Sequence, residues 1–167
     1  GTKDMVLNWQ EILLLCARRV DTLTVATLEA TLGHYRRGRH NDIPTIELIF
    51  KPEEELRAAA QRCARRLKAF FKNTRIQRVY IEPVPVEDTV GGGSFPQSVL
   101  RGWAVALRLP EMGSAGKLAE RLRLCAHPVI TGAGEDRVLF HMRTVRPGDE
   151  KWILEALADI LPPTRER

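Results

Sequence analysis

The spacing of apolar residues predicts that the first part of the chain is mainly helical. Apolar positions three and four residues apart predict one helix over residues 5–17 and a second over residues 23–35. Residues 46–50 are apolar but too few to distinguish a strand from a helical turn. A longer helix, from Pro52 to about Lys72, opens with three glutamates, which suit the positive end of a helix dipole.

The second part of the chain alternates between strand and helix patterns. Residues 75–83 and 102–109 alternate as strands do, and residues 128–131 and 137–141 predict two short strands around a turn at residues 132–136. Ser114 and Asp149 stand where they can cap two further helices. This order predicts an α+β fold: a small antiparallel or mixed four-stranded sheet with helices on one face, preceded by an N-terminal helical segment.

The apolar run at residues 12–15 is too apolar to face water on the first predicted helix. We therefore expect residues 1–50 to form a helical linker segment that packs on a large domain or a partner chain. Residues 51–167 are expected to form the small α+β domain that follows it.

Composition adds a preference for anionic partners, because the net charge is +5 at neutral pH. The basic residues of the helix over residues 52–72 form either an RNA-facing surface or an ordinary solvated face. Neither a membrane-spanning run nor a secretory signal pattern is found, so we expect a cytoplasmic protein without a membrane partner. The three cysteines, Cys16, Cys63 and Cys125, have neither metal-site nor disulfide spacing and are interpreted as small buried residues.

The residues alone predict no catalytic constellation and no metal site. No two of the four histidines have a helical metal-ligand spacing, and Ser94 does not stand in a Gly-x-Ser-x-Gly motif. Residues 89–96 are organised around Gly91, Gly92 and Gly93, which predict a loop between two strands. This loop is either a flexible hairpin loop in solvent or a loop whose backbone lies close to another group.

Residues 90–96, Val-Gly-Gly-Gly-Ser-Phe-Pro, resemble the Val-Gly-Gly-Gly-Ser-Leu-Pro signature of bacterial selenocysteine synthases, the L-seryl-tRNA(Sec) selenium transferases. Residues 16–32 are similar to that family's Arg-Ala-Leu-Arg-Val-Asp-Lys-Leu-Thr-Leu-Ala-Ala-Leu-Glu-Ala-Thr-Leu segment. Residues 128–130 match a Pro-Val-Ile segment, and residues 138–145 resemble the family's Leu-Asp-Leu-Arg-Thr-Val. The order and spacing agree over residues 1–161, which correspond to the C-terminal part of the family's full length.

The resemblance implies a pyridoxal phosphate enzyme of fold type I. Its full-length form converts seryl-tRNA(Sec) to selenocysteinyl-tRNA(Sec) with selenophosphate and is expected to be a homo-oligomer. The resemblance places the cofactor lysine upstream of Gly1, so we expect no cofactor and no activity in the 167-residue chain by itself. It also implies substrate-binding roles for three arginines, namely Arg18, Arg19 and Arg143. It further implies that a loop lies near the site, formed by Gly91, Gly92, Gly93 and Ser94.

The chain departs from the family's pattern at two positions close to Arg18 and Arg19. The family has an Arg-x-x-Arg pair whose second member corresponds to Arg19, and Cys16 stands in place of the first. The neighbouring Arg18 is the candidate to replace that missing arginine. Thr22 stands in place of a lysine. These changes leave open a related pyridoxal-dependent lyase that acts on a free amino acid. A non-catalytic RNA-binding or assembly domain is the other alternative.

Overall fold

The computed structural model describes residues 20–90, 99–134 and 136–161. The chain divides into two compact units, Gly1–Glu47 and Leu48–Arg167. The helix predicted over residues 5–17 lies outside the described residues. In the part of the chain that the structure describes, no helix has both the length and the apolarity needed to cross a membrane.

The first unit contains helix α3 (Thr22–Arg36), which confirms the second predicted helix. Asp21 caps this helix, because its Oδ1 accepts a hydrogen bond from the backbone N–H of Thr24 at 2.8 Å. The same hydrogen bond, followed by one from the Thr24 hydroxyl, holds the pKa of the Asp21 carboxyl below its ordinary value. After the short 3₁₀ helix η1 (His40–Asp42), residues Pro44–Ile49 form α4, so the ambiguous segment before Lys51 is helical.

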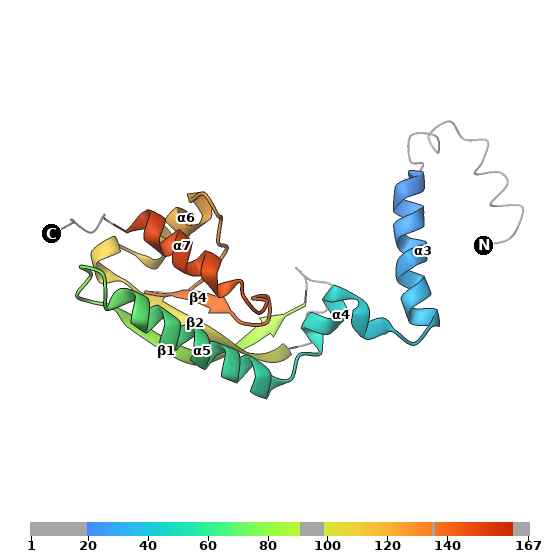
Figure 1. Ribbon diagram of the computed structural model, residues 1–167, viewed down its shortest axis with the longest axis horizontal. Helices are drawn as coiled ribbons and strands as arrows, with labels where there is room; N and C mark the ends of the chain where they lie inside the picture. Colours follow the sequence, from blue (N-terminus) through green and yellow to red (C-terminus); the bar gives the residue numbers. More distant parts are fainter. Residues whose placement is uncertain (1–19, 91–98, 135, 162–167) are drawn as a thin grey trace, which may run out of the picture. The chain divides into compact units, whose positions relative to one another are not determined.

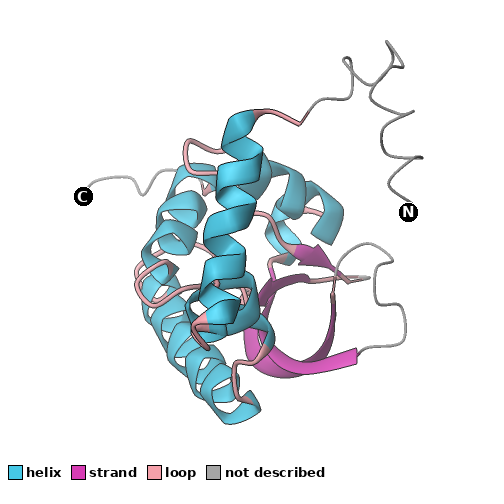
Figure 2. Cartoon of the chain, turned by 90° about the vertical axis from the view of Figure 1, so that its right-hand side faces the viewer, coloured by secondary structure: helices cyan, strands magenta, loops and turns pink. Residues whose placement is uncertain are grey.

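The second unit is built on a four-stranded antiparallel sheet of order β1-β2-β4-β3. The strands are β1 (Tyr80–Thr89), β2 (Val99–Arg108), β3 (Gly132–Ala133) and β4 (Val138–His141). Helices α5 (Glu53–Phe71), α6 (Ala115–Leu124) and α7 (Glu150–Ile160) pack on this sheet, and η2 (Pro110–Met112) follows β2 (Figures 1 and 2). The predicted α+β class with a four-stranded sheet is confirmed.

One hydrophobic core joins the sheet to these three helices. Val105 and Leu107 of β2 are fully buried, and they cluster with Leu67 of α5, Leu122 of α6 and Leu157 of α7. Val105 and Leu107 are two residues apart, so they point to the same face of the sheet. The positions of Gly102, Ala104 and Ala106 therefore belong to the opposite face.

Two strands differ from their predicted positions. β1 covers Tyr80–Thr89 rather than residues 75–83, although it contains Pro83 and Pro85. As an edge strand of the sheet, it tolerates proline because one side of its backbone has no ladder partner. β3 is Gly132–Ala133, which lies inside the predicted turn and not at the predicted strand over residues 128–131. The N–H of Val129 donates to Leu122 O at 2.8 Å, and pairing with β4 begins only at Gly132.

The two predicted helix caps have different outcomes. Ser114 caps α6 as predicted, accepting from the N–H of Lys117 at 3.4 Å. Asp149 occupies the N-cap position of α7, but its Oδ2 accepts from Arg146 N–H at 3.3 Å instead of from the helix. The carboxylate therefore closes the turn before α7.

Candidate functional site at the end of the β1–β2 hairpin

The ladder places two polar side chains on the face of the sheet opposite the core. Ala104 of β2 pairs with His141 of β4, and Leu100 of β2 pairs with Asp88 of β1. Because paired residues share a face, Asp88 and His141 lie on the face that carries Ala104. Both are close to the end of the hairpin at which residues 90–98 connect β1 to β2.

The Asp88 carboxylate bridges His141 and Arg143. Its Oδ1 lies 2.7 Å from Nδ1 of His141, and its Oδ2 accepts from Nε of Arg143 at 2.8 Å. Only 10% of the Asp88 side chain is exposed, so water does little to weaken these contacts. An ionised carboxylate only accepts hydrogen bonds, so Nδ1 of His141 carries the proton in this arrangement.

Two glycines leave room for these side chains. A Cβ atom at Gly102 would overlap Oδ2 of Asp88, and a Cβ atom at Gly132 would lie 2.8 Å from Nε2 of His141. Real Cβ atoms do not approach other atoms this closely. Gly102 therefore permits the Asp88 side chain to cross β2 and reach Arg143.

Arg143 is almost completely buried, with 7% of its surface exposed. Its Nη1 donates to the carbonyl oxygens of Leu48 and Ile49, both at 3.0 Å, and its Nη2 donates to Arg101 O at 2.7 Å. Together with Nε on Asp88, every nitrogen of the guanidinium has an acceptor. Arg143 therefore ties both strands of the hairpin to the backbone of Leu48 and Ile49, at the start of the second unit.

Most of the predicted site residues cannot be placed. Arg18 and Arg19 fall within residues 1–19, and Gly91, Gly92, Gly93 and Ser94 fall within residues 91–98, so both sets lie outside the described residues. Of the predicted residues, Arg143 alone is described. It lies within hydrogen-bonding distance of Asp88 and Arg101, one on each side of the glycine run. Its contact with a substrate stays a prediction.

Sequence reasoning missed Asp88, His141 and Gly102. Gly102 offered a signal, because a glycine within a strand often marks a close approach by another group. His141 offered none, since its partner is 53 residues away in sequence.

The described residues do not fit pyridoxal phosphate as a lysine-bound cofactor. Lys68, Lys72, Lys117 and Lys151 are exposed, and the half-buried Lys51 donates to Arg143 O at 3.4 Å. None of these lysines lies in a closed site that would hold a Schiff base. Among the described residues, no group of three or more histidine, cysteine or acidic side chains could hold a metal ion.

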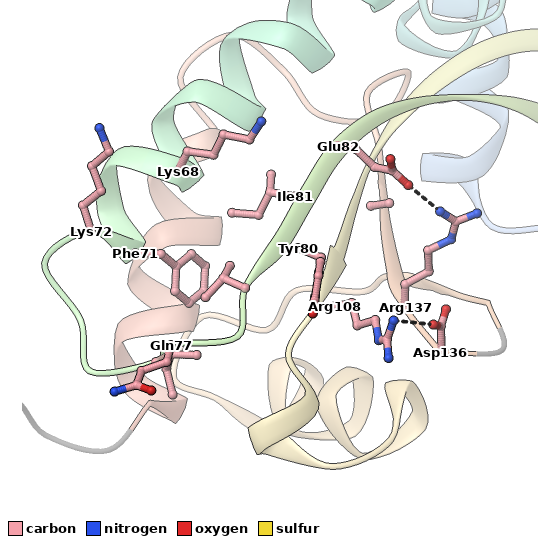
Figure 3. A pocket seen from close by; sticks show the side chains of 13 residues that line it. Lys68, Phe71, Lys72, Gln77, Tyr80, Ile81, Glu82, Arg108, Asp136 and Arg137 are labelled. Atoms are coloured by element: carbon pink, nitrogen blue, oxygen red, sulfur yellow. Dashed lines mark hydrogen bonds and ion pairs between the residues drawn. The ribbon is translucent and has the colours of Figure 1, made fainter.

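A cavity of about 610 Å³ lies at the opposite end of the hairpin, where β1 begins and β2 ends. Figure 3 shows Lys68 of α5 and Lys72, the C-cap of that helix, on one side and two ion pairs on the other. These pairs join Arg137 to Glu82 at 2.7 Å and Arg108 to Asp136 at 3.3 Å. The rest of the lining is Gln77 together with apolar and aromatic side chains, namely Phe71, Ile76, Val79, Tyr80, Ile81 and Ala106.

Comparison with known proteins identifies the family. The sequence model of the family described as L-seryl-tRNA selenium transferase matches residues 1–146. The chain is 34% identical over 161 residues to the L-seryl-tRNA(Sec) selenium transferase of Aquifex aeolicus, 32% over 163 residues to that of Moorella thermoacetica and 35% over 162 residues to that of Hyphomonas neptunium. Each match covers 96% of this chain and 34% of the relative, so the chain spans about a third of the length of these proteins. The resemblance found in the sequence is thus confirmed, and the chain belongs to the L-seryl-tRNA selenium transferase family.

Proposed function

We propose that the chain is the C-terminal α+β domain, with its preceding helical segment, of an L-seryl-tRNA(Sec) selenium transferase. The complete protein would convert seryl-tRNA(Sec) to selenocysteinyl-tRNA(Sec), with selenophosphate as the selenium donor. The observation that carries this proposal is the family match over residues 1–146, together with relatives of that name across 96% of the chain.

We propose two roles for the predicted site residues. Arg18 and Arg19 would bind the anionic part of the selenium donor or substrate, because a guanidinium forms paired, charge-assisted hydrogen bonds with such groups. Arg143 would act by positioning the strands on both sides of Gly91–Ser94. Its burial and its contacts with Asp88 and Arg101 support this positioning role more strongly than direct substrate contact.

The longer protein would use pyridoxal phosphate, which supplies an electron sink for chemistry at the serine carbons. Since the described residues do not fit a lysine-bound cofactor, this domain would contribute arginines and backbone to a site whose cofactor is held by other parts of the protein. We also propose that the longer protein assembles into a homo-oligomer. This proposal rests on membership of the family alone.

The test is a conversion assay with the complete protein that contains this chain. We expect radiolabelled seryl-tRNA(Sec) to yield labelled selenocysteinyl-tRNA(Sec) when selenophosphate is added. Free serine replaces the charged tRNA in a parallel reaction. Turnover of free serine without turnover of the charged tRNA would contradict the proposal and identify a lyase.

A further inference from the structure

We propose that the cavity between α5 and the start of β1 binds a nucleotide of an RNA chain, with its phosphates on Lys68 and Lys72 and its base against the apolar wall. The choice of RNA rests on the proposed function. The cavity itself is defined by the structure: its volume of about 610 Å³ is in the range of small-molecule sites. It lies at the end of the hairpin remote from Asp88 and Arg143, so it is a second site on this domain.

The charges around the cavity favour an anion. Arg108 and Arg137 are already paired with carboxylates, whereas Lys68 and Lys72 have no ion-pair partner among the described residues. Lys68 lies in the last turn of α5, and Lys72, four residues later, is the C-cap of the same helix with helical backbone angles. The two side chains therefore project from one helix face. Two adjacent unpaired ammonium groups suit one or two phosphate groups.

Further basic residues continue beyond the cavity. Arg65 lies one turn before Lys68 on the same face of α5, and Arg75 and Arg78 follow in the exposed segment that leads to β1. This segment is held in place, because the N–H groups of Gln77 and Arg78 both donate to Oε1 of Glu111, at 3.1 and 3.0 Å. A row of several cations favours a phosphate backbone over a single small anion.

The wall of the cavity suits a flat, apolar group. The guanidinium of Arg108 lies over the Tyr80 ring, with 5.2 Å between its Cζ atom and the ring centroid. Tyr80 and Arg108 belong to the sheet face that carries Ala106, so this part of the cavity meets the lysines around the free edge of β1. Tyr80 is 55% exposed although it is aromatic, which leaves ring surface for stacking. Nucleobases stack on tyrosine rings and on guanidinium planes. An acidic peptide would use the lysines but would leave this surface uncovered.

The test measures binding of RNA to the 167-residue chain by fluorescence anisotropy over a range of salt concentrations. The probes are a labelled single-stranded RNA and a labelled tRNA, and adenosine monophosphate is the competitor. The variants are the double substitution Lys68→Gln with Lys72→Gln, and Tyr80→Ala. Lys117→Gln with Lys151→Gln is the matched control, since these exposed lysines of α6 and α7 do not line the cavity.

We expect two different signatures from the two variants. Loss of Lys68 and Lys72 should lower the slope of log K against log salt by about 1.4 for single-stranded RNA, because each phosphate contact contributes roughly 0.7. Tyr80→Ala should weaken binding roughly tenfold with an unchanged slope, as loss of stacking does. Adenosine monophosphate should compete only weakly, since it lacks the extended backbone.

Three results would overturn the proposal. One is an absence of RNA binding by the wild-type chain, and another is an equal loss of slope in the control pair, which would indicate diffuse charge. The third is tight binding of the mononucleotide without binding of RNA. None of these results depends on turnover, so they are distinct from a failure of the selenium transfer assay. Unchanged melting temperatures of the variants verify that the fold is intact.

Discussion

Replacement of Arg143 by methionine is expected to destabilise the α+β unit severely. The substitution keeps an apolar stem of similar length but removes the guanidinium. It leaves the Asp88 carboxylate, 10% exposed, without its cationic partner, and it leaves three carbonyl oxygens without this donor. Breaking a buried ion pair from one side costs about 3–5 kcal/mol.

The loss is measured by urea denaturation and by thermal unfolding. A domain of this size loses roughly 3 °C of melting temperature per kcal/mol, so Arg143→Met should lower the melting temperature by roughly 9–15 °C. Arg146→Met is the matched control, because Arg146 is exposed and its side chain forms no ion pair among the described residues. The control should change stability by less than about 0.5 kcal/mol.

A double-mutant cycle with Asp88→Ala isolates the pair itself. The two substitutions share one interaction, so the double variant should be more stable than the sum of the two losses predicts, by about 1.5–3 kcal/mol. A loss below about 1 kcal/mol for Arg143→Met, or strict additivity in the cycle, would show that the Asp88–Arg143 pair does not stabilise the unit.

The same substitution in the complete enzyme separates the two roles of Arg143. A positioning role predicts that kcat/KM falls in Arg143→Met and that Asp88→Ala produces a comparable fall, because both loosen the hairpin. A direct substrate contact predicts a large effect for Arg143→Met alone. A lower melting temperature with unchanged kcat/KM would show that Arg143 is purely structural.

Gly102→Ala should cost about 1–3 kcal/mol of stability, since the new Cβ overlaps Oδ2 of Asp88, and most of this cost should disappear in an Asp88→Ala background. A full cost in that background would contradict the assigned cause. Burial, assisted by the Glu150 carboxylate, raises the pKa of the Cys63 thiol to about 11. Because this pKa is higher in the folded state, the protonated thiol contributes stability that is fully present below the unfolded pKa near 9. Roughly 2–3 kcal/mol of the free energy of unfolding is lost as the pH rises through 11. Urea midpoints between pH 8 and 11 should therefore fall more in the wild type than in Cys63→Ala. Asp21→Ala should lower the helix signal in circular dichroism at neutral pH. The Asp21 cap is expected to weaken as the pH falls through its lowered pKa, so an acid titration identical in both proteins would disprove the cap.

The helices could be predicted because their signals are local. The apolar spacing of α5 and α7 and the capping residues of α3 and α6 are each contained within a few residues. The bounds of β1 and β3 could not be predicted so well, because pairing with a distant strand sets them. Pro83 and Pro85 indicate the end of a strand until β1 is known to be an edge strand.

The candidate site illustrates the same limit. Arg143 was singled out from a sequence motif, but its acceptors are 42 to 95 residues away in sequence. No periodicity relates Asp88, His141 and Gly102, which meet only when β1, β2 and β4 pair. One sequence taken by itself carries no record of such contacts.

Selenium incorporation in cells tests whether this chain is part of a selenium transferase. A bacterial strain that lacks its own L-seryl-tRNA(Sec) selenium transferase receives the complete gene that encodes this chain and is grown with radioactive selenite. The account predicts labelled selenoproteins with the intact gene, and no label when the unit that begins at Leu48 is deleted. Intact, folded protein that restores no label would contradict the account.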